Sequence, residues 1–372
     1  MQVDSPTLIL DVAGAERGIG VVVRGAADAA QILRGAARIV LVTNELEETQ
    51  RLVEQEFGPS PACELEIVHA PQKLPKTFNS PVDVYRSHPQ SCIRMAMDIA
   101  KATPRSALIS PTTTGLVMTA ATFTLGRVKG IERPPIGTIL PTKGRQVFFV
   151  DAGSVVDAKA RHLYQFAVLA HLYVKSMSKI ERPSIALLSN GSEEYKGNAV
   201  VKEAYEYLEA DKDLNFTGYV EGHTMFEGDL DIMVCDGFLG NILLKFAEGA
   251  SFVMTDILKQ EIKSNWFTAL ATKVFLSAPL KRFRQRLDYA EVGGAPLLGL
   301  NGNVMICHGR SPAHAYKNAL LGGRDVAEQD IAGQVAKYLV EHPEMLVDRN
   351  GNKKDEERRS ASPGRRETDA GT

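Results

Sequence analysis

Short apolar runs recur along the chain, and turn-forming residues bound each run. Most runs are rich in Val, Ile and Leu without polar alternation, which is typical of strands buried on both faces of a sheet. The pattern predicts strands at residues 7–11, 38–43, 64–69, 106–110, 146–151, 184–189, 214–219, 231–236 and 304–308. Apolar residues at helical spacing lie between them, at 93–102, 163–177, 197–208 and 241–258. This alternation predicts an α/β fold with a mostly parallel, doubly wound sheet.

Loops that follow five of the predicted strands are rich in glycine, hydroxyl, amide and carboxylate groups. These loops begin at Asp11, Ser110, Asp151, Ser189 and Asp236. Ligands of such sheets bind beyond the carboxyl ends of the strands, and loops of this kind can present backbone N–H groups to an anion. One such loop would be weak support because glycine also serves ordinary turns. Five in one chain favour a ligand cleft.

Two segments near the end of the chain differ from the rest. Residues 259–290 place apolar side chains at helical intervals among many basic residues, and Pro279 is expected to separate two helices. This amphipathic hairpin can lie on an anionic membrane surface or meet an acidic partner, or it can pack in a dimer interface with its basic face solvated. Residues 349–372 contain no Val, Leu, Ile or Phe and are expected to be disordered. The remaining residues 1–348 are expected to form one large domain.

Composition narrows the class of protein. The chain has 372 residues, 44% hydrophobic and 24% charged, with a formal net charge of −2. These are globular proportions, and no global field attracts nucleic acid. The four cysteines are widely spaced, which argues against a zinc site or a disulfide framework and favours reduced thiols in the cytoplasm. The sequence shows neither a signal peptide nor an apolar run of about 20 residues, so a membrane span is not expected.

Common cofactor and metal motifs are absent from the sequence. The eight histidines are scattered without HExxH spacing, and GxSxG, Walker A and strand-associated GxGxxG patterns do not occur. We therefore predict neither a metal ion nor a bound cofactor. A dehydrogenase is also disfavoured, because the sequence shows no clear cluster of metal-binding aspartates.

Two segments of the sequence contain side chains that can bind an anion. Lys196 lies in a loop that opens a helix, where a cation and the helix N-terminus can share a phosphate, and Asn198 or a neighbour can cap that helix. Asn241 offers a donor and an acceptor at the start of the next helix. The structural alternatives are an exposed loop lysine and a tight turn with a capping Asn. A third segment, residues 289–302, is rich in glycine.

In this order and spacing, the three segments resemble the bacterial phosphate:acyl-carrier-protein acyltransferase family. The resemblance extends from about Leu8 to Ala327, and its most specific parts are residues 193–198, 234–241 and 293–302. It implies a fold like that of isocitrate and isopropylmalate dehydrogenases and of phosphotransacetylases. It also implies a homodimer with a helical hairpin near the dimer interface.

The resemblance further implies transfer of a fatty acyl chain from the thioester of acyl carrier protein to inorganic phosphate, without a cofactor. The acyl phosphate then feeds a membrane glycerol-3-phosphate acyltransferase. The implied location is the cytoplasm, peripherally on the inner face of the plasma membrane. Because phosphate is already a nucleophile, the reaction needs no covalent serine or cysteine intermediate.

The expected site combines three catalytic residues with a pocket of loop residues. Lys196 is expected to hold phosphate or the oxyanion, and Asn198 and Asn241 to donate hydrogen bonds. The substrate-binding residues are expected to be Asp11, Gly14, Ser110, Thr114, Gly115, Asp151, Gly153, Asp236 and Gly237. Acyl carrier protein, which is acidic, is expected to bind at Arg127, Lys129, Arg133 and the basic residues at 281–286.

Several pocket loops depart from the family pattern. Thr112 stands where the family has glycine, Glu16 replaces an aspartate, and Val155 replaces an asparagine. Loss of glycine restricts the backbone, and loss of asparagine removes hydrogen-bonding groups. Two alternatives therefore remain open beside the leading hypothesis. One is transfer from a coenzyme A thioester, and the other is a non-catalytic homologue that serves as a membrane-associated scaffold for acyl carrier protein.

Overall fold

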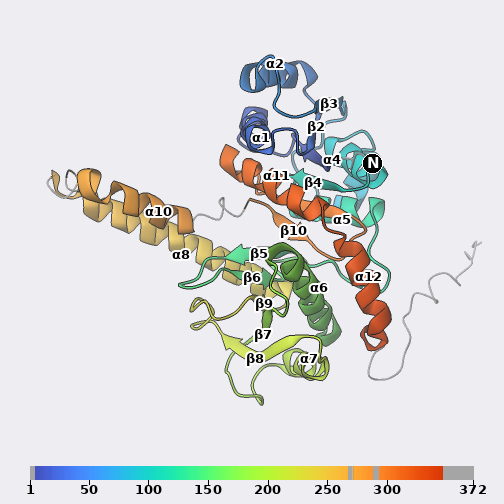
Figure 1. Cartoon of the computed structure of the whole chain (residues 1–372), viewed down its shortest axis with the longest axis vertical. Helices are drawn as coiled ribbons and strands as arrows, with labels where there is room; N and C mark the ends of the chain where they lie inside the picture. Colours follow the sequence, from blue (N-terminus) through green and yellow to red (C-terminus); the bar gives the residue numbers. More distant parts are fainter. Residues whose placement is uncertain (1–4, 267–269, 271, 288–292, 347–372) are drawn as a thin grey trace, which may run out of the picture.

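The computed structural model describes residues 5–266, 270, 272–287 and 293–346, which form two sheets with helices packed around them (Figure 1). The first sheet has the order β10-β11-β4-β1-β2-β3 and the second β5-β6-β9-β7-β8. The strands of the first sheet are β1 (Thr7–Asp11), β2 (Arg38–Thr43), β3 (Leu65–His69), β4 (Ser106–Ser110), β10 (Ala295–Leu297) and β11 (Asn303–Ile306). Those of the second are β5 (Gly137–Leu140), β6 (Val147–Val150), β7 (Ser184–Ser189), β8 (Asn215–Glu221) and β9 (Ile232–Val234).

Both sheets are mostly parallel, which confirms the predicted α/β class. In the first sheet, β1 runs parallel to β2 and β4, β3 to β2, and β11 to β4. In the second, β6, β9, β7 and β8 are mutually parallel. The two antiparallel pairs lie at the edges, where β10 pairs with β11 and β5 with β6. The sequence pattern predicts neither β5 nor β10.

Helices cover both faces of the first sheet, because its central strands are apolar on both sides. Leu8 and Leu10 pack in a cluster with α1 (Ile19–Leu33) and α11 (Ala313–Ala327), whereas Ile9 between them packs with α4 (Cys92–Ala102) and α5 (Thr114–Thr124). Two further helices, α2 (Leu46–Phe57) and α3 (Pro81–Ser87), contact α1 and α5 respectively. Successive strand residues point to opposite faces, so a continuous apolar run suits a strand between two helical layers.

One face of the second sheet packs against helices, and the other belongs to an apolar cluster that also contains residues of the first sheet. Val150, Leu187 and Val234 pack with α6 (Ala160–Ser178), α7 (Ala199–Ala210) and α12 (Ile331–Glu341). A short 3-10 helix, η3 (Pro343–Leu346), follows α12. On the opposite face, Phe149 and Met233 belong to the same apolar cluster as Ile9 of the first sheet. This cluster spans both sheets, so their facing sides share one apolar core.

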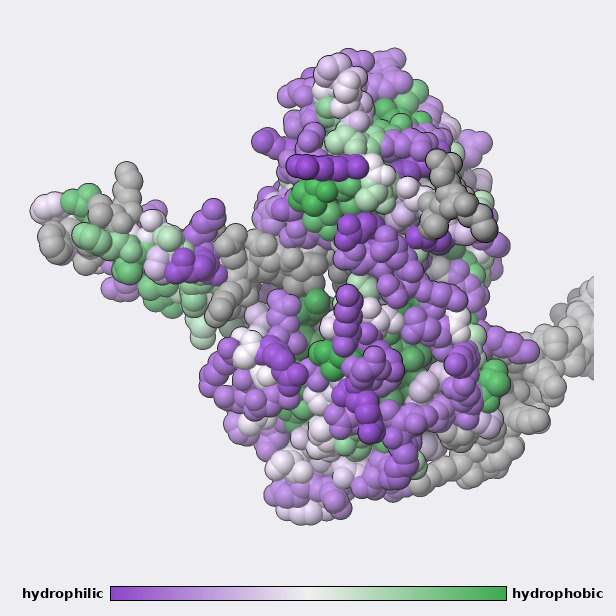
Figure 2. All heavy atoms as spheres, in the orientation of Figure 1, coloured by the Kyte–Doolittle hydropathy of each residue, from purple (hydrophilic) through white to green (hydrophobic). Residues whose placement is uncertain are grey.

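A helical arm projects away from the sheets and carries apolar residues on its visible face (Figures 1 and 2). It comprises α8 (Gly237–Lys263), a π-helical turn η1 (Thr272–Leu276) and α10 (Ser277–Leu287). The predicted helix at 241–258 and the predicted start of the hairpin at residue 259 belong to one continuous helix, α8, which begins at Gly237. The expectation that Pro279 separates two helices is wrong, because Pro279 is the third residue of α10, within the first turn, where a missing N–H is tolerated.

Within the described part of the chain, no helix is long and apolar enough to cross a bilayer. The tail predicted to be disordered, 349–372, lies outside the described residues.

Candidate active site

Three loops of the second sheet emerge at one edge, because β6, β9 and β7 are adjacent and parallel. Residues 151–153 follow β6, residues 236–241 follow β9, and residues 190–198 follow β7. The carboxyl edge of a parallel sheet is where α/β proteins bind ligands. The topology therefore gathers Lys196, Asn198, Asn241 and the 151–153 loop at one edge of this sheet.

Asp151 organises the first of these loops. Its Oδ1 accepts hydrogen bonds from the backbone N–H groups of Ile136 (3.0 Å), Gly153 (3.1 Å) and Ser154 (3.0 Å). Its Oδ2 accepts from Ser154 (3.1 Å) and Val155 (2.7 Å). Burial raises the pKa of Asp151, and the backbone donors oppose that rise. Its carboxylate orders the loop around the candidate site, and the predicted contact with substrate stays a prediction.

The start of α8 packs tightly on the Asp151 loop. Asp236 caps the helix, accepting from the N–H of Leu239 at 2.9 Å. A Cβ at Gly237 would lie 2.6 Å from Asp151 Oδ2, and one at Gly240 would lie 1.8 Å from the Asp151 carbonyl oxygen. Only glycine permits this approach. The predicted residues Asp236 and Gly237 therefore hold α8 in place at the site.

Asn241 is exposed one turn into α8, beside the 151–153 loop. A Cβ at Gly153 would lie 3.1 Å from the Asn241 Cβ and 3.4 Å from its Oδ1. Gly153 has φ +136°, a conformation that other residues rarely adopt. The structure thus brings together three predicted residues, Asp151, Gly153 and Asn241, and leaves the Asn241 amide accessible to a ligand.

Lys196 is half-buried in the loop before α7. Its backbone N–H donates to the Glu193 carbonyl at 2.9 Å, and its Nζ lies 5.3 Å from the centroid of the Tyr195 ring. Asn198 caps α7 by accepting from the N–H of Val201 at 2.9 Å. The capping role considered for Asn198 is confirmed, so its Oδ1 is already occupied, and Lys196 stands two residues before a helix N-terminus.

A second group of predicted residues lies at the carboxyl edge of the first sheet. The buried Asp11 Oδ2 accepts from the hydroxyls of Ser110 (2.7 Å) and Thr112 (2.8 Å), while its Oδ1 accepts from the N–H of Ala13 (3.2 Å). Burial raises the pKa of Asp11, and these donors lower it. A Cβ at Gly14 would lie 2.5 Å from the Thr112 backbone nitrogen. The loops after β1 and β4 are thereby fastened together.

Thr114 and Gly115 are exposed at the start of α5, beside the Asp11 group. The N-cap of this helix, Thr113, makes no side-chain capping hydrogen bond. Its first N–H groups therefore need other partners, and an anion is a suitable one.

The sequence reasoning missed a third loop at this edge, which follows β11 next to β4. There the Arg310 Nε donates to Glu16 Oε2 at 2.9 Å, and the Glu16 N–H donates to the Gly309 carbonyl at 2.8 Å. The hydrogen bond from Arg310 is the main cause that lowers the pKa of Glu16. The sequence does indicate this loop, because the predicted strand at 304–308 ends at His308 and is followed directly by Gly309 and Arg310.

Arg127, a candidate contact for the carrier protein, is engaged within its own loop. Its Nη1 donates to the carbonyl oxygens of Ile131 and Glu132. The Glu132 carboxylate in turn pairs with Arg161 and with His162 Nε2 at 2.9 Å. These contacts give Arg127 a structural role in the segment that precedes β5.

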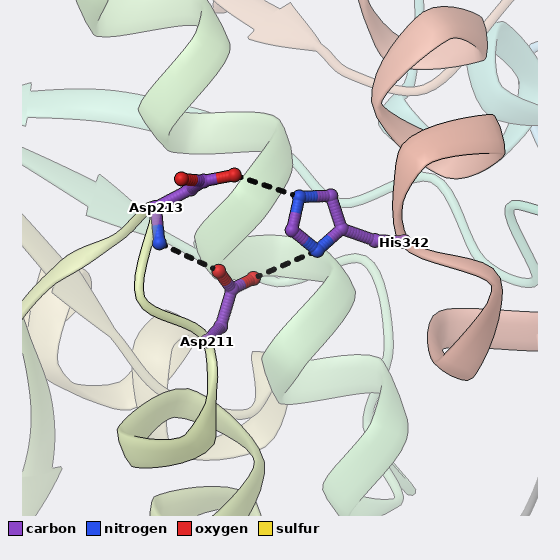
Figure 3. Close-up of side chains that lie close together, drawn as sticks. All are labelled: Asp211, Asp213 and His342. Carbon is purple, nitrogen blue, oxygen red and sulfur yellow. Dashed lines mark hydrogen bonds and ion pairs between the residues drawn. The ribbon is translucent and has the colours of Figure 1, made fainter.

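One cluster outside these loops has ligand types that could hold a metal ion. Asp211, Asp213 and His342 lie together, with His342 Nε2 3.0 Å from Asp213 Oδ2 (Figure 3). Asp211 Oδ2 already accepts from the hydroxyls of Tyr164 and Tyr338, both at 2.7 Å, and its Oδ1 from the N–H of Asp213. These bonds use the carboxylate to fasten α12 to α6, so we interpret the cluster as structural.

Comparisons with known proteins decide the family. The sequence profile described as fatty acid synthesis protein matches residues 7–334. The chain belongs to this family. It is 42% identical over 333 residues to the phosphate acyltransferase of Pelotomaculum thermopropionicum, covering 89% of this chain and 94% of that one. It is 36% identical over 344 residues to the phosphate acyltransferase of Nitratidesulfovibrio vulgaris, covering 92% and 97% respectively.

Two solved structures share the fold. EutD phosphotransacetylase from Staphylococcus aureus superposes with a TM-score of 0.54 at 14% identity, over 87% of this chain and 94% of that one. A phosphotransacetylase from Streptococcus pyogenes gives 0.53 at 17% identity, with the same coverage. The expected likeness to the phosphotransacetylase fold is confirmed.

Proposed function

We propose that this protein transfers a fatty acyl group from the thioester of acyl carrier protein to inorganic phosphate, giving acyl phosphate and the free carrier thiol. The observation that carries the proposal is the match, over about nine-tenths of the chain, to relatives named phosphate acyltransferase. The proposal is supported by a lysine, an exposed amide side chain and two helix N-termini at the carboxyl edge of the second sheet, all of which suit phosphate and an oxyanion.

The reaction needs positioning and charge stabilisation more than a protein nucleophile. A phosphate oxygen attacks the thioester carbonyl carbon, and the C–S bond breaks as the tetrahedral oxyanion collapses; the released thiolate takes up a proton. Lys196 supplies positive charge beside the N-terminus of α7, and the Asn241 amide offers a donor. All four cysteines are buried, and burial raises the pKa of each thiol, which disfavours a thiolate nucleophile.

A turnover assay tests the proposal. Purified protein is incubated with palmitoyl acyl carrier protein and phosphate, and both acyl phosphate and free carrier thiol are followed. Phosphate-dependent release in equal amounts is expected, with a loss of about 10²–10³-fold in kcat/KM for Lys196→Ala. Lys202→Ala is the matched control, because Lys202 is an exposed lysine on α7, beyond the loop. A parallel reaction with palmitoyl-coenzyme A tests the alternative donor, and no turnover with either donor supports the scaffold alternative.

The projecting arm supports a peripheral membrane location and a homodimer, which we propose as further properties. Its exposed large apolar side chains include Met254 (67%), Trp266 (76%), Phe275 (78%) and Phe283 (43%). An apolar surface of this extent favours contact with a second surface. Lys281 and Arg282 add positive charge that suits an anionic leaflet.

This location would place the enzyme on the cytoplasmic face of the plasma membrane, where a membrane glycerol-3-phosphate acyltransferase can take up the acyl phosphate. Flotation with anionic liposomes, comparing wild type with the Trp266→Ser, Phe275→Ser double variant, tests the membrane contact. Equal flotation of the two proteins would count against the arm as the anchor. Sedimentation velocity on the same samples tests the homodimer.

A further inference from the structure

A long-chain donor raises the question of where its alkyl chain lies once the thioester carbon is at the site. A fatty acyl chain needs an apolar surface that begins beside the reacting atoms. The helix α8 begins at the site, because Asp236 caps it and Asn241 lies one turn further on. The side chains that α8 presents next to these residues are therefore the first apolar surface available to the chain.

Phe238, Ile242 and Phe246 form an apolar stripe along one face of α8. Their spacing of four residues aligns them on the same side of the helix. They are 59%, 48% and 72% exposed, respectively. We call these three residues the acyl track. It extends over about 12 Å at 1.5 Å per residue, from the first turn of the helix outward along the arm.

The track is continuous with the candidate site. Phe238 lies between Gly237 and Gly240, the two positions where an added Cβ would collide with the Asp151 carboxylate and carbonyl oxygen. Asn241, beside Gly153, directly precedes Ile242. The helix thus turns one face to the Asp151 loop and an adjacent apolar face outward.

Two hollows of the described structure lie elsewhere and do not offer this surface. One, of about 450 Å³, is lined by Thr7 and Arg38, the first residues of β1 and β2, and so opens near the amino ends of those strands, away from the site edge. The other, beside β10 and β11, is only about 20 Å³. Neither can hold an alkyl chain whose carboxyl carbon lies beside Asn241.

We propose that the acyl track binds the alkyl chain of the donor, with the carboxyl carbon near Asn241 and the methyl end directed outward along α8. This inference rests on the proposed function and identifies the surface that gives it chain-length preference. Contact with the track removes apolar area of both chain and protein from water, so longer donors gain affinity in proportion to the length covered.

Chain-length selectivity tests the track. The measured quantity is kcat/KM for palmitoyl acyl carrier protein divided by that for butyryl acyl carrier protein, at saturating phosphate and without lipid. We expect Ile242→Ser and Phe246→Ser each to lower this ratio about tenfold, the loss expected for one large apolar contact. Phe252→Ser is the matched control, because Phe252 has the same 72% exposure as Phe246 but lies six residues, about 9 Å, beyond the outer end of the track. Its ratio should stay within twofold of wild type.

Each outcome separates the track from the function on which it rests. An unchanged ratio in both track variants, with phosphate-dependent turnover by wild type, overturns the track and leaves the proposed function standing. The same is true if the variants dissociate a dimer in sedimentation while the ratio stays constant, since the face then contacts a second copy. Equal loss with both donors in variants of normal circular dichroism also overturns it. Wild type without turnover of either donor overturns the proposed function itself, and the track with it.

Discussion

Replacing Asp151 by Asn is the substitution whose effect the structure specifies most closely. The two side chains have nearly the same shape, but the Asn amide donates where a carboxylate oxygen accepts. Oδ1 of Asp151 accepts from three backbone N–H groups and Oδ2 from two, with Ser154 shared between them. Whichever oxygen becomes the amide nitrogen, at least one N–H group loses its only partner and a second faces another donor.

The magnitude follows from the donors that lose their only partner: the Val155 N–H if the amide nitrogen replaces Oδ2, or the Ile136 and Gly153 N–H groups if it replaces Oδ1. Leaving one such donor unpaired costs about 1–3 kcal/mol, so Asp151→Asn should lower the free energy of unfolding by at least about 1–3 kcal/mol. This is a large fraction of a typical total of about 5–15 kcal/mol. Because the same loop supports Asn241, kcat should fall as well.

Urea unfolding followed by circular dichroism measures the effect as a shift in midpoint. Asp157→Asn is the control, since Asp157 is an exposed carboxylate six positions along the same segment. A free energy of unfolding for Asp151→Asn within about 0.5 kcal/mol of the control would refute the organising role assigned to this carboxylate.

Substitutions at three further positions, Gly240, Thr112 and Glu16, test other contacts. Gly240→Ala places a methyl group 1.8 Å from a backbone carbonyl oxygen and should destabilise the fold in urea by more than about 3 kcal/mol, whereas Gly249→Ala, with open space around it, should be neutral or stabilising. Thr112→Val should lower stability by about 1–2 kcal/mol, and Thr112→Ser should retain most of it, because only the hydroxyl bonds the buried carboxylate. Glu16 has its pKa lowered below 4.5 mainly by the hydrogen bond from Arg310, so its contribution is present above that pH and is lost as pH falls through the folded-state pKa. Glu16→Gln should flatten this part of the stability–pH curve, and 1 M salt should weaken the difference.

Local patterning was sufficient to predict the strands that lie between two helical layers. β1 and β4 are buried along their whole length, so each reads as an unbroken apolar run. β5 and β10 are edge strands of four and three residues that contain Gly137 and Pro296, and their pairing is antiparallel. Such strands depend on their neighbours for stability and lack a signature of their own.

The site was predictable as a set of loops, but not in the roles of its members. The sequence places Asp151 and Asp236 at strand ends, yet only the fold shows that they accept backbone N–H groups and hold α8 against β6. The ion pair of Glu16 and Arg310 joins residues 294 positions apart, which no local pattern reports. Thr112, a position at which we expect a departure from the family pattern, donates a hydrogen bond to the buried Asp11 carboxylate.

Phosphate-dependent cleavage of palmitoyl acyl carrier protein, measured side by side for wild type, Lys196→Ala and Lys202→Ala, tests the central claim most directly. The account predicts equal amounts of acyl phosphate and free thiol from wild type and Lys202→Ala, and a rate about 10²–10³-fold lower for Lys196→Ala. Wild-type turnover no faster than that of a folded Lys196→Ala protein would contradict it.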